Sequence, residues 1–220
     1  MVTICPTVLA KDPHEFREQM ERIAPFAERI QIDLTDGHFA SHKTLGLEHV
    51  WWPVGIQADL HLMYKNPLQH IEAILKLEPH LVIIHAEADG DFYELANALK
   101  AADIKVGVAL LPETPVRLLA EVMTHIDHIL IFSGSLGHFG GRADLSLLGK
   151  ISEAKALKSD IEVGWDGGVN EHNIKTLVHN GVDVLNVGGF IQNSERPQEA
   201  YATLKKIASE AKIHETETGA

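Results

Sequence analysis

The feature that most constrains this chain is a regular alternation of short, apolar, β-rich runs with longer amphipathic segments. This alternation is typical of βα units that build a parallel sheet. Eight strand-like runs fall at residues 2–9, 29–34, 56–63, 81–86, 105–111, 128–133, 161–166 and 183–189. Eight units in 220 residues match a (β/α)8 barrel better than an open doubly wound sheet, which has fewer strands. We therefore expect an α/β protein with a TIM-barrel fold.

The segments between the strand-like runs are expected to be helices, and several open with Asp, Asn or Thr, the residues that cap helix N-termini. The second unit is the weak one, because "LGLEHVWW" at residues 45–52 supports only a short helix. No linker or low-complexity segment divides the chain, so we expect one domain over residues 1–220. From about residue 208 onward the polar end is expected to be frayed.

The composition limits which binding partners and which cellular compartment we expect. With 31 acidic against 19 basic residues the net charge is −12, which repels nucleic acids and anionic membranes. An anionic ligand must then be held mainly by local groups such as backbone N–H donors. A single cysteine, Cys5, excludes a disulfide within the chain and suits a reducing cytoplasm. We see no leader and no membrane-spanning segment, and expect a cytoplasmic protein.

Polar residues interrupt three of the strand-like runs near their ends. A period of two places Gln31 and Asp33 on one face of "RIQIDL", opposite the isoleucines and leucine that would pack on helices. In "ADLHLM" the same rule groups His61 and Met63 with Asp59, and "VGWDGG" ends in Asp166. Catalytic groups of barrels come from such strand ends.

Each of these residues alone has a structural explanation, as a hydrogen-bonded core histidine or a helix cap. Two carboxylates and an imidazole converging on one barrel mouth would be costly to bury without a cation, a shared proton or a polar substrate. We therefore expect Asp33, His61 and Asp166 to form a site. Asp36 lies in an Asp-Gly turn and is expected to order that loop.

Three glycine pairs follow the last three strand-like runs. The loops after the seventh and eighth strands of this fold form its usual phosphate pocket, and glycine allows backbone N–H groups to approach an anion. Such a pocket needs no lysine, in keeping with the acidic charge. The expected phosphate-binding residues are Gly140, Gly141, Gly167, Gly168, Gly188 and Gly189.

The order and spacing of eight motifs resemble the ribulose-phosphate 3-epimerase family, from about residue 4 to about residue 204. The motifs are "CPTVLAKD", "IDLTDGHF", "ADLHLM", "VIIHAEA", "KVGVALLPETPV", "FGG", "WDGGVN" and "DVLNVGGFI". The resemblance implies a ribulose-phosphate-binding TIM barrel that interconverts D-ribulose 5-phosphate and D-xylulose 5-phosphate. It also implies an oligomer and one divalent metal ion held by two histidines and two aspartates.

Residue by residue, the resemblance makes Asp33 the proton acceptor and Asp166 the proton donor, with both also binding the metal. His61 corresponds to a metal ligand, and Thr7, His61 and Met63 to substrate-binding positions. Removing the proton on C3 beside the C2 ketone and returning one to the opposite face needs two such acids. A metal bridging the two oxygens would stabilise the enediolate.

The chain departs from the family where one metal-binding histidine is expected, because Gln31 stands there. A neutral amide oxygen is a poor ligand for zinc or iron but an acceptable one for magnesium or manganese. It can also hydrogen-bond a carboxylate directly, without any metal. Thr7 replaces the usual serine, and the loop "SGSLGHFGGR" is one residue longer than usual and lacks an Asn-Pro pair.

Three functions follow from these residues. The first is an epimerase for ribulose 5-phosphate or another ketose phosphate. The second is a non-catalytic sugar-phosphate binder, which Gln31 favours and the two retained aspartates disfavour. The third, a phosphosugar decarboxylase or aldolase, would be expected to carry a lysine near Asp33, whereas the chain reads "DLTD".

Overall fold

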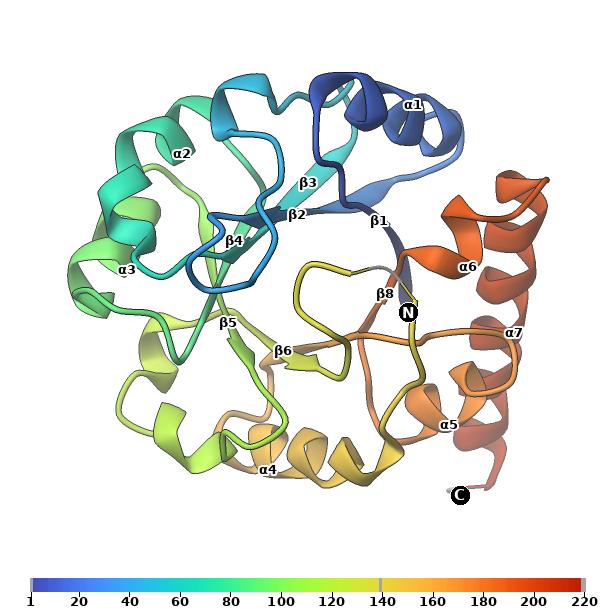
Figure 1. Cartoon of the computed structure of the whole chain (residues 1–220). Helices are drawn as coiled ribbons and strands as arrows, with labels where there is room; N and C mark the ends of the chain where they lie inside the picture. The colour runs from blue at the N-terminus through green and yellow to red at the C-terminus, as the bar shows by residue number, and fades with distance from the viewer. Residues whose placement is uncertain (1, 139, 219–220) are drawn as a thin grey trace.

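The barrel expected from the sequence is present in the computed structural model of the protein, which describes residues 2–138 and 140–218. Phe139, the first residue of the "FGG" motif, lies outside the described residues. Eight parallel strands pair in chain order, and the last strand pairs with the first to close the barrel (Figure 1). The strands are β1 (Thr3–Val8), β2 (Arg29–Thr35), β3 (Gln57–Met63), β4 (Leu81–His85), β5 (Lys105–Leu110), β6 (His128–Phe132), β7 (Glu162–Asp166) and β8 (Val184–Val187).

The helices form an outer ring around this barrel, as Figure 1 shows in a view along its axis. The α-helices are α1 (Pro13–Ile23), α2 (Ile71–Leu77), α3 (Phe92–Ala101), α4 (Gly149–Leu157), α5 (Ile174–His179), α6 (Gly189–Gln192) and α7 (Pro197–Thr218). Short 3-10 helices are η1 (Leu47–His49), η2 (Pro67–His70), η3 (Val116–Leu119), η4 (Met123–His125) and η5 (Leu145–Leu148). The second βα unit contains only a short helix, as expected, since η1 is the helical segment between β2 and β3.

Side-chain caps begin two of the helices that the sequence predicted. Asp12 precedes α1 and accepts hydrogen bonds from the backbone N–H groups of His14 and Glu15. Asp91 does the same for the N–H of Glu94 at the start of α3. These oxygens satisfy N–H groups that the first turn of a helix leaves unpaired.

The main hydrophobic core lies between the barrel and the helices. Phe16 and Met20 of α1 are fully buried there, on the apolar face of an otherwise charged helix. The barrel interior is partly apolar, with a small cluster of Leu81, Ile83, Ala109 and Leu130 on strands β4 to β6. Polar side chains fill much of the remaining interior, which distinguishes this barrel from one that is packed with branched apolar residues throughout.

An ion network closes the barrel at the amino ends of its strands. Arg29 Nε donates to Asp59 Oδ2 at 2.7 Å, and the guanidinium makes two hydrogen bonds of 2.9 Å to Glu162. His128 Nδ1 lies 2.7 Å from the same Glu162 carboxylate. Because the charges are paired, they are tolerated at depth.

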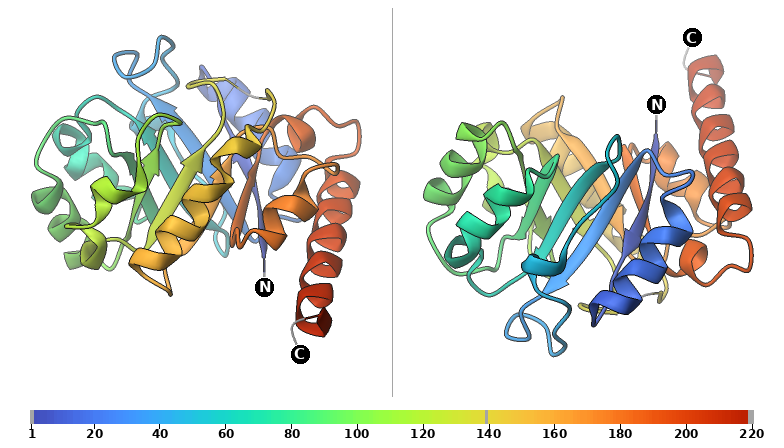
Figure 2. Two further views of the ribbon diagram at one scale, coloured as in Figure 1. Left: turned by 90° about the horizontal axis from the view of Figure 1, so that it is seen from below. Right: turned by 90° about the horizontal axis from the view of Figure 1, so that it is seen from above.

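The carboxyl ends of the strands and the loops that follow them form the barrel mouth. Figure 2 shows the loops after β2 and β6 projecting from this end, while the N-terminus lies at the other end. Each helix in the described part of the chain is too short or too polar to cross a bilayer.

The chain end that we expected to be frayed is helical as far as it is described. Helix α7 continues to Thr218, and Ala208 and Ala211 are buried by packing against the rest of the molecule. This packing was not evident from the sequence, because the buried residues are small alanines among polar ones. Residues 219–220 of the expected tail lie outside the described part of the chain.

Candidate active site

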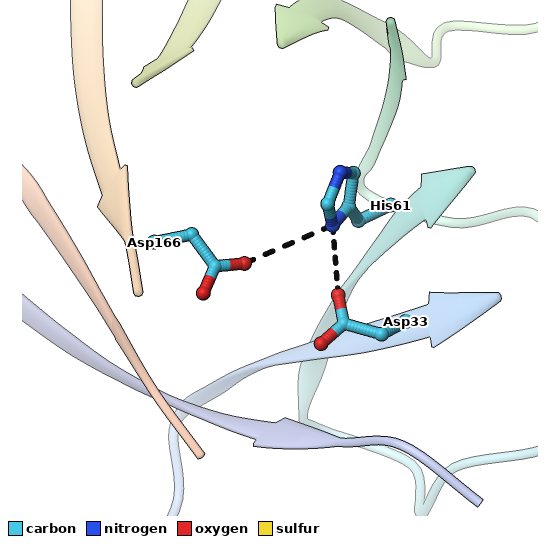
Figure 3. A group of neighbouring side chains, drawn as sticks. All are labelled: Asp33, His61 and Asp166. Carbon is cyan, nitrogen blue, oxygen red and sulfur yellow. Dashed lines mark hydrogen bonds and ion pairs between the residues drawn. The ribbon is translucent and has the colours of Figure 1, made fainter. Parts of the chain in front are cut away.

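The three residues that the sequence brought together as a site meet at the barrel mouth. Asp33 and His61 are register partners on the neighbouring strands β2 and β3, while Asp166 ends β7 across the barrel. His61 Nδ1 lies 2.8 Å from Asp33 Oδ1 and 3.7 Å from Asp166 Oδ2 (Figure 3). One ligand atom of each residue lies within 4.8 Å of the others, so the group could hold a metal ion.

Gln31 joins the two aspartates through a single amide nitrogen. Its Nε2 donates to Asp33 Oδ1 at 2.8 Å and to Asp166 Oδ2 at 2.6 Å, which uses both N–H groups of the amide. The residue is fully buried. Its Oε1 is also buried and makes no hydrogen bond to the rest of the described chain. The side chain thus spans the gap between two carboxylates that would otherwise repel each other.

Burial sets the protonation of the site. Desolvation raises the pKa of Asp33 to about 7, although the hydrogen bond from Gln31 opposes the shift. Desolvation also raises the pKa of Asp166, and the nearby charge of Asp33 adds to this effect. The pKa of His61 is lowered to about 4 by desolvation. Near neutral pH the site can therefore hold one carboxylic acid and one carboxylate beside a neutral imidazole.

A second imidazole extends the cluster to the carboxyl end of β4. His85 ends β4, and its Nε2 lies 2.9 Å from Nε2 of His61. Its Nδ1 lies 3.5 Å from Glu87 Oε2. Desolvation lowers the pKa of His85 to about 4. Burial raises the pKa of Glu87, but the neighbouring His85 and the hydrogen bonds from Thr114 and backbone N–H groups outweigh it, so the net shift is downward.

A cavity of about 260 Å³ opens above the aspartates. Its wall contains nearly every residue that the sequence assigned to substrate or phosphate: Thr7, Met63, Gly140, Gly141, Gly167, Gly168, Gly188 and Gly189. Asp33 and Asp166 line the cavity too, whereas Gln31 and His61 are fully buried beneath it. The glycine loops and the acidic pair therefore face the same space.

The glycines after β7 are required by close backbone packing. Gly167 and Gly168 have φ angles of +116° and +67°, which L side chains rarely adopt. A Cβ on Gly167 would lie 2.3 Å from the backbone nitrogen of Gly134, and one on Gly168 would lie 2.1 Å from that of Ala143. The loop after β7 thus packs directly on the loop after β6.

Asp36 orders the loop after β2, as expected. Its Oδ1 accepts hydrogen bonds from the backbone N–H groups of His38 at 2.7 Å and Phe39 at 2.8 Å. Its Oδ2 accepts another from Lys65, also at 2.7 Å. All three lower the pKa of Asp36 against the opposing effect of burial. The carboxylate is therefore occupied by backbone N–H groups of its own loop and of the loop after β3.

Three asparagines that we did not single out from the sequence also line the cavity: Asn170, Asn186 and Asn193. Asn186 is inward-facing on β8, in register with Asp166, and both of its amide atoms are buried without a partner in the described part of the chain. The period of two on the last strand-like run could have revealed Asn186. The other two lie in loops, where no period applies.

These features define a class: a (β/α)8-barrel protein with an acid–base cluster and glycine-rich loops around one cavity at the carboxyl ends of its strands. The model of the ribulose-phosphate 3 epimerase family matches residues 3–192. The chain belongs to this family.

Curated proteins named ribulose-phosphate 3-epimerase align with this chain over nearly their whole length. The chain is 28% identical to a ribulose-phosphate 3-epimerase of Bacillus subtilis over 214 residues, which are 93% of this chain and 99% of the relative. It is also 28% identical to the protein of that name from Mycobacterium tuberculosis over 218 residues, or 96% and 95% of the two chains.

Solved structures support the fold. A 3-hexulose-6-phosphate synthase from Salmonella typhimurium superposes with a TM-score of 0.71 over 96% of this chain and all of that chain, at 12% identity. A phosphoribosyl anthranilate isomerase from Thermococcus kodakaraensis gives a TM-score of 0.65 over 94% of this chain and 98% of that one, also at 12% identity. At such low identity these likenesses describe the barrel alone.

Proposed function

We propose that this protein epimerises C3 of a phosphorylated ketopentose, interconverting D-ribulose 5-phosphate and D-xylulose 5-phosphate. The observation that carries the proposal is the pair Asp33 and Asp166, two buried carboxyl groups of raised pKa on the non-adjacent strands β2 and β7 at the floor of the glycine-lined cavity. Family membership and the names of the relatives support the same reaction.

The reaction needs one base and one acid that exchange roles. Ionised Asp33 takes the proton from C3, and the electron pair of that C–H bond moves toward the C2 carbonyl to form an enediolate. Protonated Asp166 then delivers its proton to the opposite face of C3. A pKa near neutrality suits both steps, because each group must hold and release a proton at the working pH.

Gln31 gives the pair its geometry. Its two N–H groups hold one oxygen of each aspartate, at 2.8 Å and 2.6 Å. This leaves the second oxygen of each carboxyl group for the substrate. Buried like charges a few ångströms apart favour a state with one proton between them, which is the state that the reaction requires.

The glycine loops would receive the phosphate. They line the cavity together with Thr7 and the start of the short helix α6. Backbone N–H groups can approach an anion closely where no side chain intervenes. This mode of binding suits a protein whose net charge of −12 provides no attraction for a phosphate at long range.

One divalent metal ion fits the donor set of this site. Asp33, His61 and Asp166 would hold it, and Oε1 of Gln31, which has no hydrogen-bond partner among the described residues, offers a further oxygen once the amide is rotated. Oxygen-rich donors of this kind suit magnesium or manganese more than zinc or iron. When bound, the ion would stabilise negative charge on the oxygens of the enediolate.

The experiment that tests the proposal replaces each aspartate. Asp33→Asn and Asp166→Asn should each lower kcat by about 100- to 10,000-fold, the range typical of general acid–base groups. Binding of the sugar phosphate, measured by calorimetry, should change little. The control is Asp160→Asn, which alters an exposed carboxylate in a turn before β7. Turnover that survives either active-site substitution would refute the two-acid mechanism.

Two further expectations stay predictions: an oligomer and a cytoplasmic location.

The alternative of a non-catalytic binder draws its support from Gln31, whose two N–H groups both donate to the aspartates. It predicts that sugar phosphate binds while the C3 proton never exchanges with solvent.

A further inference from the structure

A continuous series of side-chain contacts leads from Asp33 of the proposed catalytic pair to Glu87. Asp33 Oδ1 lies 2.8 Å from Nδ1 of His61, whose Nε2 lies 2.9 Å from Nε2 of His85. Nδ1 of His85 in turn lies 3.5 Å from Oε2 of Glu87. Both imidazoles are buried, with exposures of 0% and 1%. Each ring therefore has a neighbour at both of its nitrogens.

The contact between the two rings allows only two arrangements of hydrogens. Two ring nitrogens 2.9 Å apart share one hydrogen, because one must donate and the other accept. If Nε2 of His61 donates, a neutral His61 has a lone pair on Nδ1. If Nε2 of His85 donates, Nδ1 of a neutral His61 carries the hydrogen instead. The direction of this one hydrogen bond decides what His61 offers to the site shown in Figure 3.

Glu87 selects between the two arrangements. Its Oε1 accepts hydrogen bonds from the backbone N–H of Leu111 at 3.2 Å and from the hydroxyl of Thr114. Its Oε2 and the Nδ1 of His85 are both buried without a hydrogen bond elsewhere in residues 2–138 and 140–218, and they face each other. A hydrogen on Nδ1 of His85 satisfies both atoms. Nε2 of His85 must then be the acceptor toward His61.

We propose that Glu87 acts through His85 to fix the tautomer of His61, so that Nδ1 of His61 presents a lone pair to Asp33 and Asp166. The importance of this lone pair rests on the proposed function, whereas its existence does not. It can accept the hydrogen of a protonated Asp33, or it can bind a divalent cation between the aspartates. Glu87 and His85 are thus positioning residues, because a histidine ligand is oriented by the partner of its other nitrogen.

The variant Glu87→Gln reverses the arrangement without changing the size of the side chain. The N–H of Leu111 and the hydroxyl of Thr114 continue to need an acceptor, and this need holds the amide oxygen at the Oε1 position. The new NH2 group then points at Nδ1 of His85 and donates to it. The hydrogen moves to Nε2 of His85, and His61 acquires its hydrogen on Nδ1. A matched control is Glu72→Gln on the exposed face of α2.

The measurement is ¹⁵N NMR of protein labelled in its histidine rings, which distinguishes protonated from unprotonated ring nitrogens. The His61 signals are assigned by their loss in His61→Gln. In the wild type we expect Nε2 of His61 to be protonated and Nδ1 not. Glu87→Gln should exchange the two, and Glu72→Gln should change neither. A wild type protonated on Nδ1, or His61 signals that are unchanged in Glu87→Gln, would overturn the proposal.

Binding of Mn²⁺ alone gives a second readout that needs no turnover. Glu87→Gln should weaken it by about 10- to 100-fold, the usual effect of removing a partner behind a ligand. Because neither readout needs a substrate, the tautomer can be confirmed even if the protein proves to be no epimerase. Conversely, an active enzyme with the opposite tautomer would refute this proposal and leave the proposed function intact.

Discussion

Gln31 and Asp166 are separated by 135 positions in the sequence and lie on strands that do not pair, yet they share a hydrogen bond of 2.6 Å across the barrel mouth. The same amide nitrogen also holds Asp33 at 2.8 Å. The neutral amide of Gln31 thus lies between the two acids, at the position where the resemblance to the family implied a histidine that binds a metal. The identity of this one residue should influence both metal preference and the protonation of the pair.

The first prediction concerns metal preference. Gln31→His introduces an imidazole, which zinc prefers over an amide oxygen, beside Asp33, His61 and Asp166. We expect the affinity for Zn²⁺ to rise by on the order of 10-fold or more relative to Mn²⁺. Calorimetric titration of chelated protein with each ion measures this ratio. Gln31→Leu is the control, because it removes the amide without adding a ligand, and an equal gain of zinc affinity in both variants would contradict the account.

A second prediction concerns stability and pH. The pKa of Asp33 is raised from 3.8 to about 7, so folding favours its protonated form. Its contribution to the free energy of unfolding is therefore present below about pH 4 and is lost as the pH rises through 7. Asp33→Asn removes this loss and should stabilise the chelated protein at pH 8 by roughly 2–4 kcal/mol more than at pH 5.

Urea unfolding of wild type and Asp33→Asn at the two pH values tests this sign. Asp160→Asn serves as the control, since that carboxylate is exposed. A benefit of Asp33→Asn that is the same at pH 5 and pH 8 would show that Asp33 is not buried as an acid of raised pKa.

A third prediction separates two glycines of the phosphate loops. A Cβ on Gly189 would meet its nearest neighbours at 3.4 Å, so Gly189→Ala should fold normally while narrowing the cavity. We expect it to weaken the binding of inorganic phosphate and to raise KM for the sugar phosphate. Gly167→Ala should instead destabilise the fold by at least about 2 kcal/mol, because its Cβ would lie 2.3 Å from a backbone nitrogen at a φ of +116°.

Phosphate titration and thermal unfolding of both variants distinguish these effects. If Gly189→Ala binds phosphate as well as the wild type does, the phosphate does not lie beside α6. A Gly167→Ala protein of normal stability would mean that the loops after β6 and β7 do not pack as described.

Much of this architecture could be predicted from the sequence because parallel barrels carry a strong local signal. The period of two on β2 revealed that Gln31 and Asp33 face inward, and the end of β7 revealed Asp166. The glycine pairs marked the loops that line the cavity. These inferences needed only a strand, its direction and the rule that barrel sites lie at strand ends.

Contacts between side chains from distant strands were beyond that reasoning. Nothing local shows that the amide of Gln31 bridges two carboxylates, since this depends on the closure of the barrel. The partner of His85 was also hidden, because Glu87 follows β4 in a turn where alternation no longer applies. The packing of the chain end was missed because Ala208 and Ala211 carry it among charged neighbours.

The most direct test of the proposed function is proton exchange at C3. Purified protein is incubated with D-ribulose 5-phosphate in D2O, first after chelation and then with added Mg²⁺, Mn²⁺ or Zn²⁺, and the sugar is followed by NMR. We predict that D-xylulose 5-phosphate forms and that C3 acquires deuterium, because Asp33 and Asp166 exchange their protons with solvent between turnovers. Sugar phosphate that binds but shows no exchange at C3 under any of these conditions would contradict the assignment of this chain as an active ribulose-phosphate epimerase.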